Sequence, residues 1–237
     1  MDDEVLDIKQ KIISNDQYKN WMQEISSIEN EFAKSSEFNN LITLDHGMAH
    51  MERVANNVYK LLNEYNCNYT ICKLGYIAGL IHDIGMINGK KEHAEQGAKM
   101  AKTFLQELKL VNKNDAEVIT NAIKNHGNGG DTLEPINFIL AICDKADMCK
   151  ERPLGNLSPI KFIENYTLEI KDNTLMIKYK MDNLKGKEGL YIIPKSIDIP
   201  KELCKKLGLK VGFYINGNYQ IFEDREHYKG KIYQRKE

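Results

Sequence analysis

Hydrophobic residues recur at helical spacing through roughly the first 150 residues of the chain. The segment from Val5 to Lys34 follows this spacing with few breakers, and it predicts a helix that ends in a polar stretch from Ser35 to Asn40. From His46 to Tyr65, apolar residues such as Val54 and Val58 recur about one turn apart, which predicts a second helix. This part of the chain is therefore typical of a helical bundle.

Further helices are expected before the pattern changes. The first carries Leu74, Ala78 and Ile81 on its inner face, with Thr70 as its N-cap. The second runs from about Glu92 to Leu108, and the third is capped by Asn114 or Asp115. The fourth spans about Glu134 to Lys150. A loop containing Gly85, Asn88 and Gly89 separates the first two of them. The helical region is expected to comprise residues 1–152.

After Arg152-Pro153, the period of the pattern becomes two. Alternating apolar residues at 166–170 and 175–181 flank Asp172-Asn173 and predict a β-hairpin. Pro200 is expected to open a short helix over 201–207, and Asn216-Gly217-Asn218 predicts a second hairpin turn. The charged tail from Glu223 is expected to fray. The predicted fold is therefore mainly α, with a small β-rich accessory subdomain at residues 153–237.

Composition narrows the class of protein. A chain of 237 residues allows one sizeable domain, or one domain with a small appendage. The net charge of -1 gives no strong field for nucleic acid or an anionic membrane, and we see no apolar run near the roughly 20 residues that span a bilayer. The acidic N-terminus and five cysteines without a Cys-x-x-Cys pair are typical of a cytoplasmic protein with reduced thiols.

Several polar residues interrupt the apolar stripes of these helices. They are His50, His82, His93, His126 and Asp144. A single inward histidine is usually a hydrogen-bonded core residue. Several inward histidines together with inward aspartates are better explained by a shared cation, because burying a lone carboxylate is costly. Imidazole and carboxylate ligands suit iron, manganese, zinc, nickel or cobalt. The doublet His82-Asp83 at a helix end adds a second aspartate to the set.

Three motifs in this order resemble the HD-domain phosphohydrolase superfamily. They are His46-Gly47-x-x-His50-x-x-Arg53-Val54, Leu80-Ile81-His82-Asp83-Ile84-Gly85 and Cys143-Asp144-Lys145-Ala146-Asp147. The resemblance covers roughly residues 40–152 and implies an HD-type helical bundle, with His50, His82, Asp83 and Asp144 as core metal ligands. His93 and His126 fall where two-metal members place further histidines. The likeness then implies two divalent transition-metal ions, often iron or manganese, bridged by Asp83.

The chain departs from the cyclic-di-GMP phosphodiesterase branch of this superfamily. His126 is followed by Gly-Asn-Gly-Gly, and Met86 stands where that branch has a lysine. The branch of bacterial diadenosine tetraphosphate hydrolases stays open. The resemblance implies a nucleotide-type substrate in either case.

The sequence thus predicts hydrolysis of a phosphate ester or anhydride by metal-activated water. Asp83, Lys145 and Arg53 are the candidate catalytic residues, and Arg152 is a further candidate for holding phosphate. Asp147 is expected to orient a histidine, and His46 to support the site. His227 is expected to be exposed, and a homodimer stays open.

Two other functions remain as alternatives. The protein would be a non-catalytic metal- or nucleotide-binding sensor if the metal were structural. It would be an oxygen-using enzyme if the centre were a redox-active iron pair.

Overall fold

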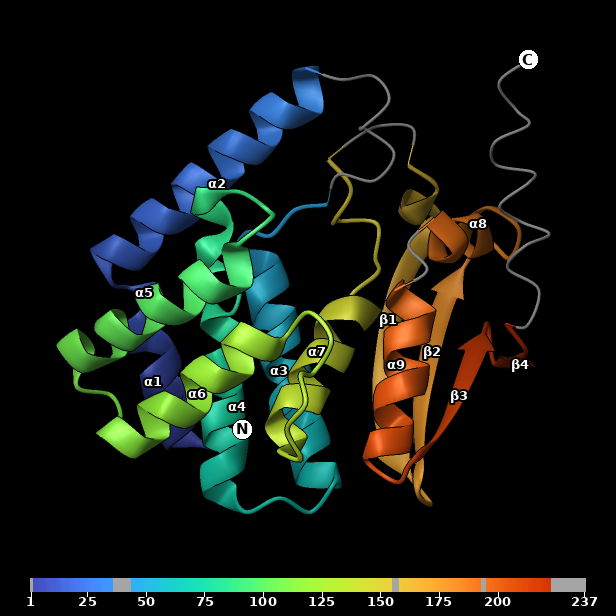
Figure 1. Cartoon of the computed structure of the whole chain (residues 1–237). Helices are drawn as coiled ribbons and strands as arrows, with labels where there is room; N and C mark the ends of the chain where they lie inside the picture. The colour runs from blue at the N-terminus through green and yellow to red at the C-terminus, as the bar shows by residue number, and fades with distance from the viewer. Residues whose placement is uncertain (1, 36–43, 155–157, 193–194, 223–237) are drawn as a thin grey trace.

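The structure is a computed structural model that describes residues 2–35, 44–154, 158–192 and 195–222. Helices form most of it, and a small sheet lies to one side (Figure 1). The α-helices are α1 (Asp3–Ile13), α2 (Asp16–Ser35), α3 (Met48–Glu64), α4 (Tyr69–Ile81), α5 (His93–Leu108), α6 (Lys113–Asn125), α7 (Pro135–Ala146), α8 (Lys185–Ile192) and α9 (Lys195–Lys206). The other elements are the 3-10 helices η2 (Ile84–Asn88) and η3 (Pro159–Phe162) and the strands β1 (Ile163–Lys171), β2 (Thr174–Met181), β3 (Lys210–Ile215) and β4 (Asn218–Gln220). The predicted fold class is confirmed.

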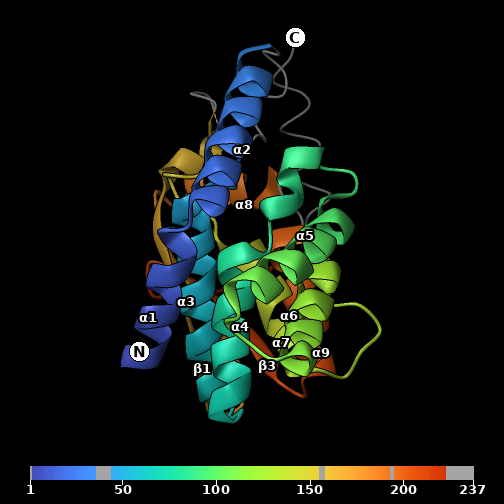
Figure 2. The ribbon, with the colours of Figure 1, turned by 90° about the vertical axis from the view of Figure 1, so that its left-hand side faces the viewer.

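Helix α4 lies at the centre of the helical part. It contacts α1, α3, α6 and α7, so it is buried on nearly all sides. Helices α3 and α4 run side by side (Figure 2). Gly79 permits this close packing, because a Cβ atom on it would lie 2.5 Å from the Cα atom of Ala55. The contact fixes the C-terminal end of α4, where His82 lies, against α3.

One described segment, Tyr69–Asn88, is long and apolar enough to cross a membrane by length and composition alone. An 18-residue window within it has a mean hydropathy of 1.2, which corrects the expectation that no such run exists. However, 78% of the apolar window is buried inside the protein. The segment is therefore accounted for as the central helix α4 and the turn after it.

The sheet has the strand order β1-β2-β3-β4. Strands β1 and β2 are antiparallel, β2 and β3 are parallel, and β3 and β4 are antiparallel. The parallel pair requires a crossover, which α8 and α9 provide. Helix α9 contacts both α7 and β3, and α3 contacts β1, so the sheet packs against the helical part. Its division from residues 1–152 as a separate domain stays a prediction.

Both predicted hairpin turns are confirmed. Asp172 and Asn173 have φ values of 48° and 56°, and Asn216 and Gly217 have φ values of 50° and 83°. Two successive residues with positive φ are the requirement of a type I′ turn, whose twist matches that of the strands it joins. These turns therefore set the registers of β1 against β2 and of β3 against β4.

The helical structure predicted from Val5 to Lys34 is confirmed, and it is divided into two helices, α1 and α2. Ser14 ends α1, and the Asn15 side chain accepts a hydrogen bond from the backbone N–H of Tyr18 at 3.2 Å. The bend buries Tyr18 completely and lets its hydroxyl donate to the carbonyl of Leu80 at 2.8 Å. A tertiary contact therefore overrides a continuous helical pattern.

Two predicted N-caps are wrong. The cap of α4 is Asn68 rather than Thr70, and its side chain accepts from the N–H of Ile71. The cap of α6 is Asn112 rather than Asn114 or Asp115, and it accepts from the N–H of Asp115. Both helices begin before their first strongly apolar residues, because capping depends on a local hydrogen bond rather than on hydrophobic period.

Other boundaries differ as well. Helix α7 ends at Ala146, earlier than Lys150, and leaves Asp147 just outside it. Helix α9 begins at Lys195, so Pro200 lies inside it instead of opening it, and α8 is an unpredicted element. Residues 36–43 of the polar stretch and the tail from Glu223, with His227, lie outside the described residues.

Candidate metal centre

The structure brings together all six side chains that the sequence singles out as metal ligands. Every one lies at or near the end of a helix: His50 in the first turn of α3, His82 as the C-cap of α4, Asp83 before η2, His93 as the first residue of α5, His126 as the C-cap of α6 and Asp144 near the end of α7. Their role as ligands stays a prediction.

The first group comprises His50, His82, Asp83 and Asp144, whose candidate ligand atoms all lie within 4.8 Å of one another. The Nε2 atom of His50 lies 3.5 Å from Oδ2 of Asp83 and 3.4 Å from Oδ1 of Asp144. The Nε2 atom of His82 lies 3.1 Å and 3.8 Å from the same two oxygens. The Nε2 atoms of the two imidazoles and one oxygen of each carboxylate therefore converge on the same small volume.

The second group comprises Asp83, His93 and His126. Oδ1 of Asp83 lies 3.5 Å from Nε2 of His93 and 3.2 Å from Nε2 of His126. The two Nε2 atoms are 3.0 Å apart. Asp83 therefore belongs to both groups, and it presents one carboxylate oxygen to each.

The Nδ1 atoms fix the protonation pattern of the four histidines. Those of His82, His93 and His126 contact the backbone carbonyls of Gly79, Lys90 and Ile123, and that of His50 contacts the carboxylate of Asp147. A carbonyl only accepts hydrogen bonds, so each Nδ1 must carry the proton. The lone pair of each neutral imidazole is then on Nε2, the atom that faces Asp83.

Burial makes this arrangement costly without a partner. Three site atoms, Nε2 of His50, Nε2 of His82 and Oδ1 of Asp83, are buried without a hydrogen bond among the described residues. An unsatisfied buried polar atom typically costs roughly 1–3 kcal/mol. Because converging imidazole and carboxylate lone pairs are ligands for divalent transition metals, the cluster could hold a metal ion.

The electrostatics keep both carboxylates ionised. Burial alone would raise the pKa of Asp83 and of Asp144. The charge of His82 beside Asp83, and of Lys145 beside Asp144, outweighs burial and holds both pKa values well below their usual range. Burial likewise lowers the pKa of His82, but Asp83 and Asp144 raise it to about 10.

Gly85 determines how closely the two groups approach. A Cβ atom on this residue would lie 2.0 Å from the carbonyl oxygen of His93 and 2.8 Å from the Cα atom of Gly97. The turn after Asp83 therefore packs directly against the first turn of α5, with no room for a side chain. This contact brings His93 to the same carboxylate that His82 faces.

Lys145 and Arg53 are both held by carboxylates. Lys145 forms an ion pair with Oδ2 of Asp144, which leaves Oδ1 toward His50. Arg53 donates from Nε and Nη2 to the two oxygens of Asp147, at 2.8 and 3.0 Å. Their side chains are 20% and 28% exposed, so both are partly open to solvent. Their predicted catalytic roles stay predictions.

Arg152, the other basic candidate, is buried. Its guanidinium donates to the backbone carbonyls of Asp45 and Asp147. These contacts tie together the chain segments that precede α3 and follow α7.

The sequence analysis missed Glu29 of α2. This buried residue forms an ion pair with Nδ1 of His46 and accepts the backbone N–H of His46 at 3.1 Å. The His46 ring lies 5.8 Å from the ring of His50, so the pair adjoins the candidate centre. A signal was present, because Ile25, Glu29 and Ala33 form a buried stripe at a spacing of four, with one inward carboxylate.

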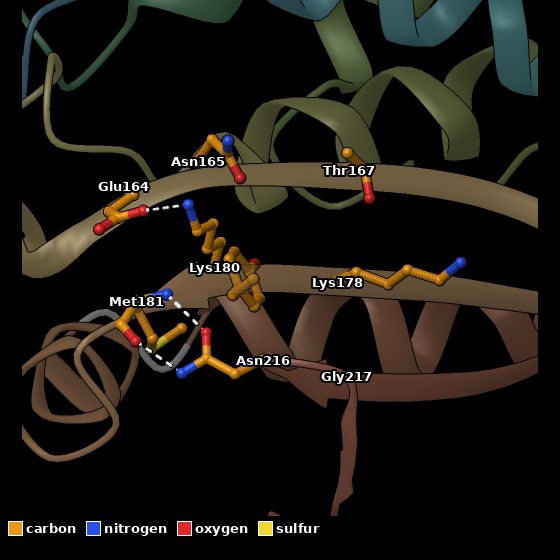
Figure 3. Close-up of a pocket in the computed structure, with 9 residues that line it drawn as sticks. Glu164, Asn165, Thr167, Lys178, Lys180, Met181, Asn216 and Gly217 are labelled. Carbon is orange, nitrogen blue, oxygen red and sulfur yellow. Dashed lines mark hydrogen bonds and ion pairs between the residues drawn. The ribbon is translucent and has the colours of Figure 1, made fainter.

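A separate shallow groove of about 550 Å³ lies on the sheet (Figure 3). It is lined by Glu164, Asn165, Thr167, Lys178, Tyr179, Lys180, Met181, Asn216 and Gly217. Lys180 pairs with Glu164 at 2.9 Å, and Lys178 pairs with Glu169 at 2.7 Å, so its cationic side chains already have anionic partners. None of the lining residues belongs to either His-Asp group.

Comparison with known proteins agrees with this geometry. Residues 47–149 match a family model described as the HD domain. No curated protein matches the chain. All six residues of the two groups lie inside the matched range, as do α3 to α7, which carry them. Residues 47–149 therefore form an HD domain, the domain of the HD metal-dependent phosphohydrolase superfamily.

Proposed function

We propose that the protein hydrolyses a phosphate ester or anhydride in a nucleotide-type substrate, using water activated by two divalent metal ions. The observation that carries the proposal is the position of Asp83 between two sets of imidazole nitrogens. One carboxylate oxygen faces His50 and His82, and the other faces His93 and His126. Asp83 would therefore offer a ligand atom to each of the two ions.

The donor set defines the cofactor that we propose. His50, His82, Asp83 and Asp144 would hold one ion, and Asp83, His93 and His126 the other. Nitrogen and oxygen donors in this mixture suit iron or manganese, with zinc, nickel and cobalt as alternatives. Such ions supply a lowered pKa for a bound water and positive charge for the phosphoryl oxygens.

The protein's own residues prepare the centre for this chemistry. Asp83 and Asp144 are held ionised, and the Nε2 atoms of the four histidines all face the Asp83 carboxylate. We assign Lys145 and Arg53 to the phosphoryl oxygens, because both are partly exposed cations whose carboxylate partners adjoin the candidate ligands. Their partners Asp144 and Asp147 hold them in place there.

His46 is the residue that we assign to proton transfer toward the leaving oxygen. Glu29 accepts from its Nδ1, so Nε2 is the atom left to exchange a proton. Its side chain is 17% exposed, which leaves it open to solvent and substrate. A carboxylate behind an imidazole stabilises the charged form that a proton donor needs.

The test is direct. Protein purified without chelator should carry about two transition-metal ions per chain and should hydrolyse bis-p-nitrophenyl phosphate or members of a nucleotide panel. Treatment with chelator should abolish turnover, and Mn²⁺ or Fe²⁺ should restore it. Bound metal without turnover on any substrate would contradict the proposal and favour a sensor. Oxygen consumption without phosphate release would favour a redox enzyme. We also propose a cytoplasmic location, where nucleotide substrates are available. Whether the chain forms a homodimer can be measured by gel filtration.

A further inference from the structure

A buried hub lies directly behind His50. Asp147 is fully buried, and its Oδ2 lies 2.5 Å from Nδ1 of His50. Arg53 holds both of its oxygens, and Arg152 lies 3.6 Å from Oδ2. Because Nδ1 of His50 is bound to Asp147, the orientation of Nε2 toward Asp83 depends on where Asp147 sits.

The C-terminal sheet contacts the helix that carries His50 through Tyr166 of β1. The Tyr166 hydroxyl accepts a hydrogen bond from the Asn57 amide of α3 at 2.9 Å. Burial, and then the charge of Asp147, raise the pKa of this phenol well above its usual value, so the phenol keeps its proton.

A second tyrosine of the sheet anchors the neighbouring residue. The hydroxyl of Tyr179 on β2 donates to the carbonyl of Ala146 at 3.4 Å, one residue before Asp147. The rings of Tyr166 and Tyr179 pack together with 6.4 Å between their centroids. Through this pair of rings, the sheet contacts the end of α7 one residue before Asp147.

The same strand is attached along the helix that carries His50. Besides the Asn57 contact, Nζ of Lys60 donates to the carbonyl of Leu168 at 2.8 Å, and Oε2 of Glu64 accepts from the N–H of Ile170 at 2.7 Å. The three helix residues are spaced three and four positions apart, and their partners on the strand are spaced two apart. One face of α3 therefore contacts β1 along its length. Helix α3 and strand β1 therefore form one unit.

We propose that the C-terminal sheet is a built-in support of the metal centre, in which Tyr166 and Tyr179 hold the end of α7, and with it Asp147, against α3 and thereby position His50. This inference rests on the proposed metal centre, and it assigns a role to the region that the sequence treats as accessory. Tyr166 is a positioning residue, because it belongs to neither His-Asp group and does not line the groove on the sheet.

The test measures metal binding instead of turnover. Tyr166→Phe removes one hydroxyl and keeps the ring, and the exposed Tyr219→Phe on the same sheet is the matched control. Mn²⁺ affinity should fall roughly three- to ten-fold in Tyr166→Phe and stay unchanged in the control, and Asp147→Asn should lose roughly 10- to 100-fold. The absorption bands of the Co²⁺-loaded protein should shift in Tyr166→Phe, because they report the geometry around His50.

A double variant separates positioning from general destabilisation. If Tyr166 acts through Asp147, adding Tyr166→Phe to Asp147→Asn should cost little further affinity, whereas independent effects would add. Should Asp147→Asn fail to fold, Asn57→Leu replaces it, since it removes the hydrogen-bond donor to the Tyr166 hydroxyl. Unchanged affinity and spectrum in Tyr166→Phe, or full additivity, would overturn the inference alone. Wild-type protein that binds no metal would overturn the proposed metal centre as well.

Discussion

The helical part and the C-terminal sheet both bring opposite charges together, but in opposite surroundings. In the helical part, Asp83 and Asp144 are buried among imidazoles, with atoms that lack hydrogen-bond partners. On the sheet, Lys178 pairs with Glu169 and Lys180 with Glu164 at the surface, where water screens both ions. Carboxylates therefore indicate a candidate site in the helical part and an ordinary solvated surface on the sheet. Burial, rather than residue type, distinguishes the two cases.

The largest effect should come from the shared carboxylate. Asp83→Ala removes a ligand from both groups and should lower kcat/KM by roughly a thousand-fold or more, because metal ions contribute several kcal/mol to the transition state. It should also lower the metal content per chain. Steady-state kinetics and elemental analysis measure both, with the exposed Asp131→Ala as control. If the Asp83→Ala variant kept its metal and its activity, the buried carboxylates of the helical part would matter no more than the exposed ion pairs of the sheet.

The next effect concerns the buried pair beside the centre. His46→Gln should lower kcat by roughly a hundred-fold or more, since general acid catalysis commonly contributes that much. Metal content should remain near the wild-type value, because His46 belongs to neither group. Glu29→Gln should produce a smaller loss in the same direction. A parallel loss of metal and activity in His46→Gln would mean that the pair supports the ligands instead.

A smaller effect concerns pH. The pKa of His82 is raised to about 10 by the carboxylates around it, which outweigh burial, so a proton is held there at neutral pH until a cation displaces it. Metal uptake should therefore release protons, and affinity should fall roughly tenfold per pH unit for each proton released as the pH decreases. Calorimetric titration in two buffers of different ionisation enthalpy measures the number released. A binding enthalpy independent of the buffer would contradict the prediction.

The smallest effect should come from the sheet surface. Glu169→Gln breaks the exposed pair with Lys178 and should leave both Tm and metal affinity unchanged within measurement error, because exposed pairs contribute little. Thermal unfolding with and without Mn²⁺ provides the measurement. A clear loss of metal affinity in this variant would show that the outer face of the sheet also supports the centre.

The convergence of the candidate ligands other than Asp83 was predictable because each lies on the apolar stripe of its own helix. His126 and Asp144, for example, follow Ala122 and Leu140 by four residues. Periodicity reports which side of an element faces inward, and for these residues that was enough to suggest a shared site.

What could not be predicted depends on contacts between distant elements. Glu29 and His46 are 17 positions apart, and Asn57 and Tyr166 are 109 apart. No local pattern relates such pairs, and the division of the first helix at Asn15 likewise reflects the burial of Tyr18. Local patterns thus predicted which side of each helix faces inward. The contacts that support the candidate ligands could be identified only from the packed structure.

Gly85 has no side chain, yet its contact with α5 determines whether His93 and His82 can face the same carboxylate. Only a hydrogen fits between it and the His93 carbonyl, so any substitution must move α5 outward. Such a shift would withdraw His93 from Asp83 and leave His50, His82 and Asp144 in place. A single amino-acid change at a residue outside the ligand set would then separate a two-ion protein from a one-ion protein. This backbone contact is therefore a point at which related chains could diverge in chemistry while keeping every ligand.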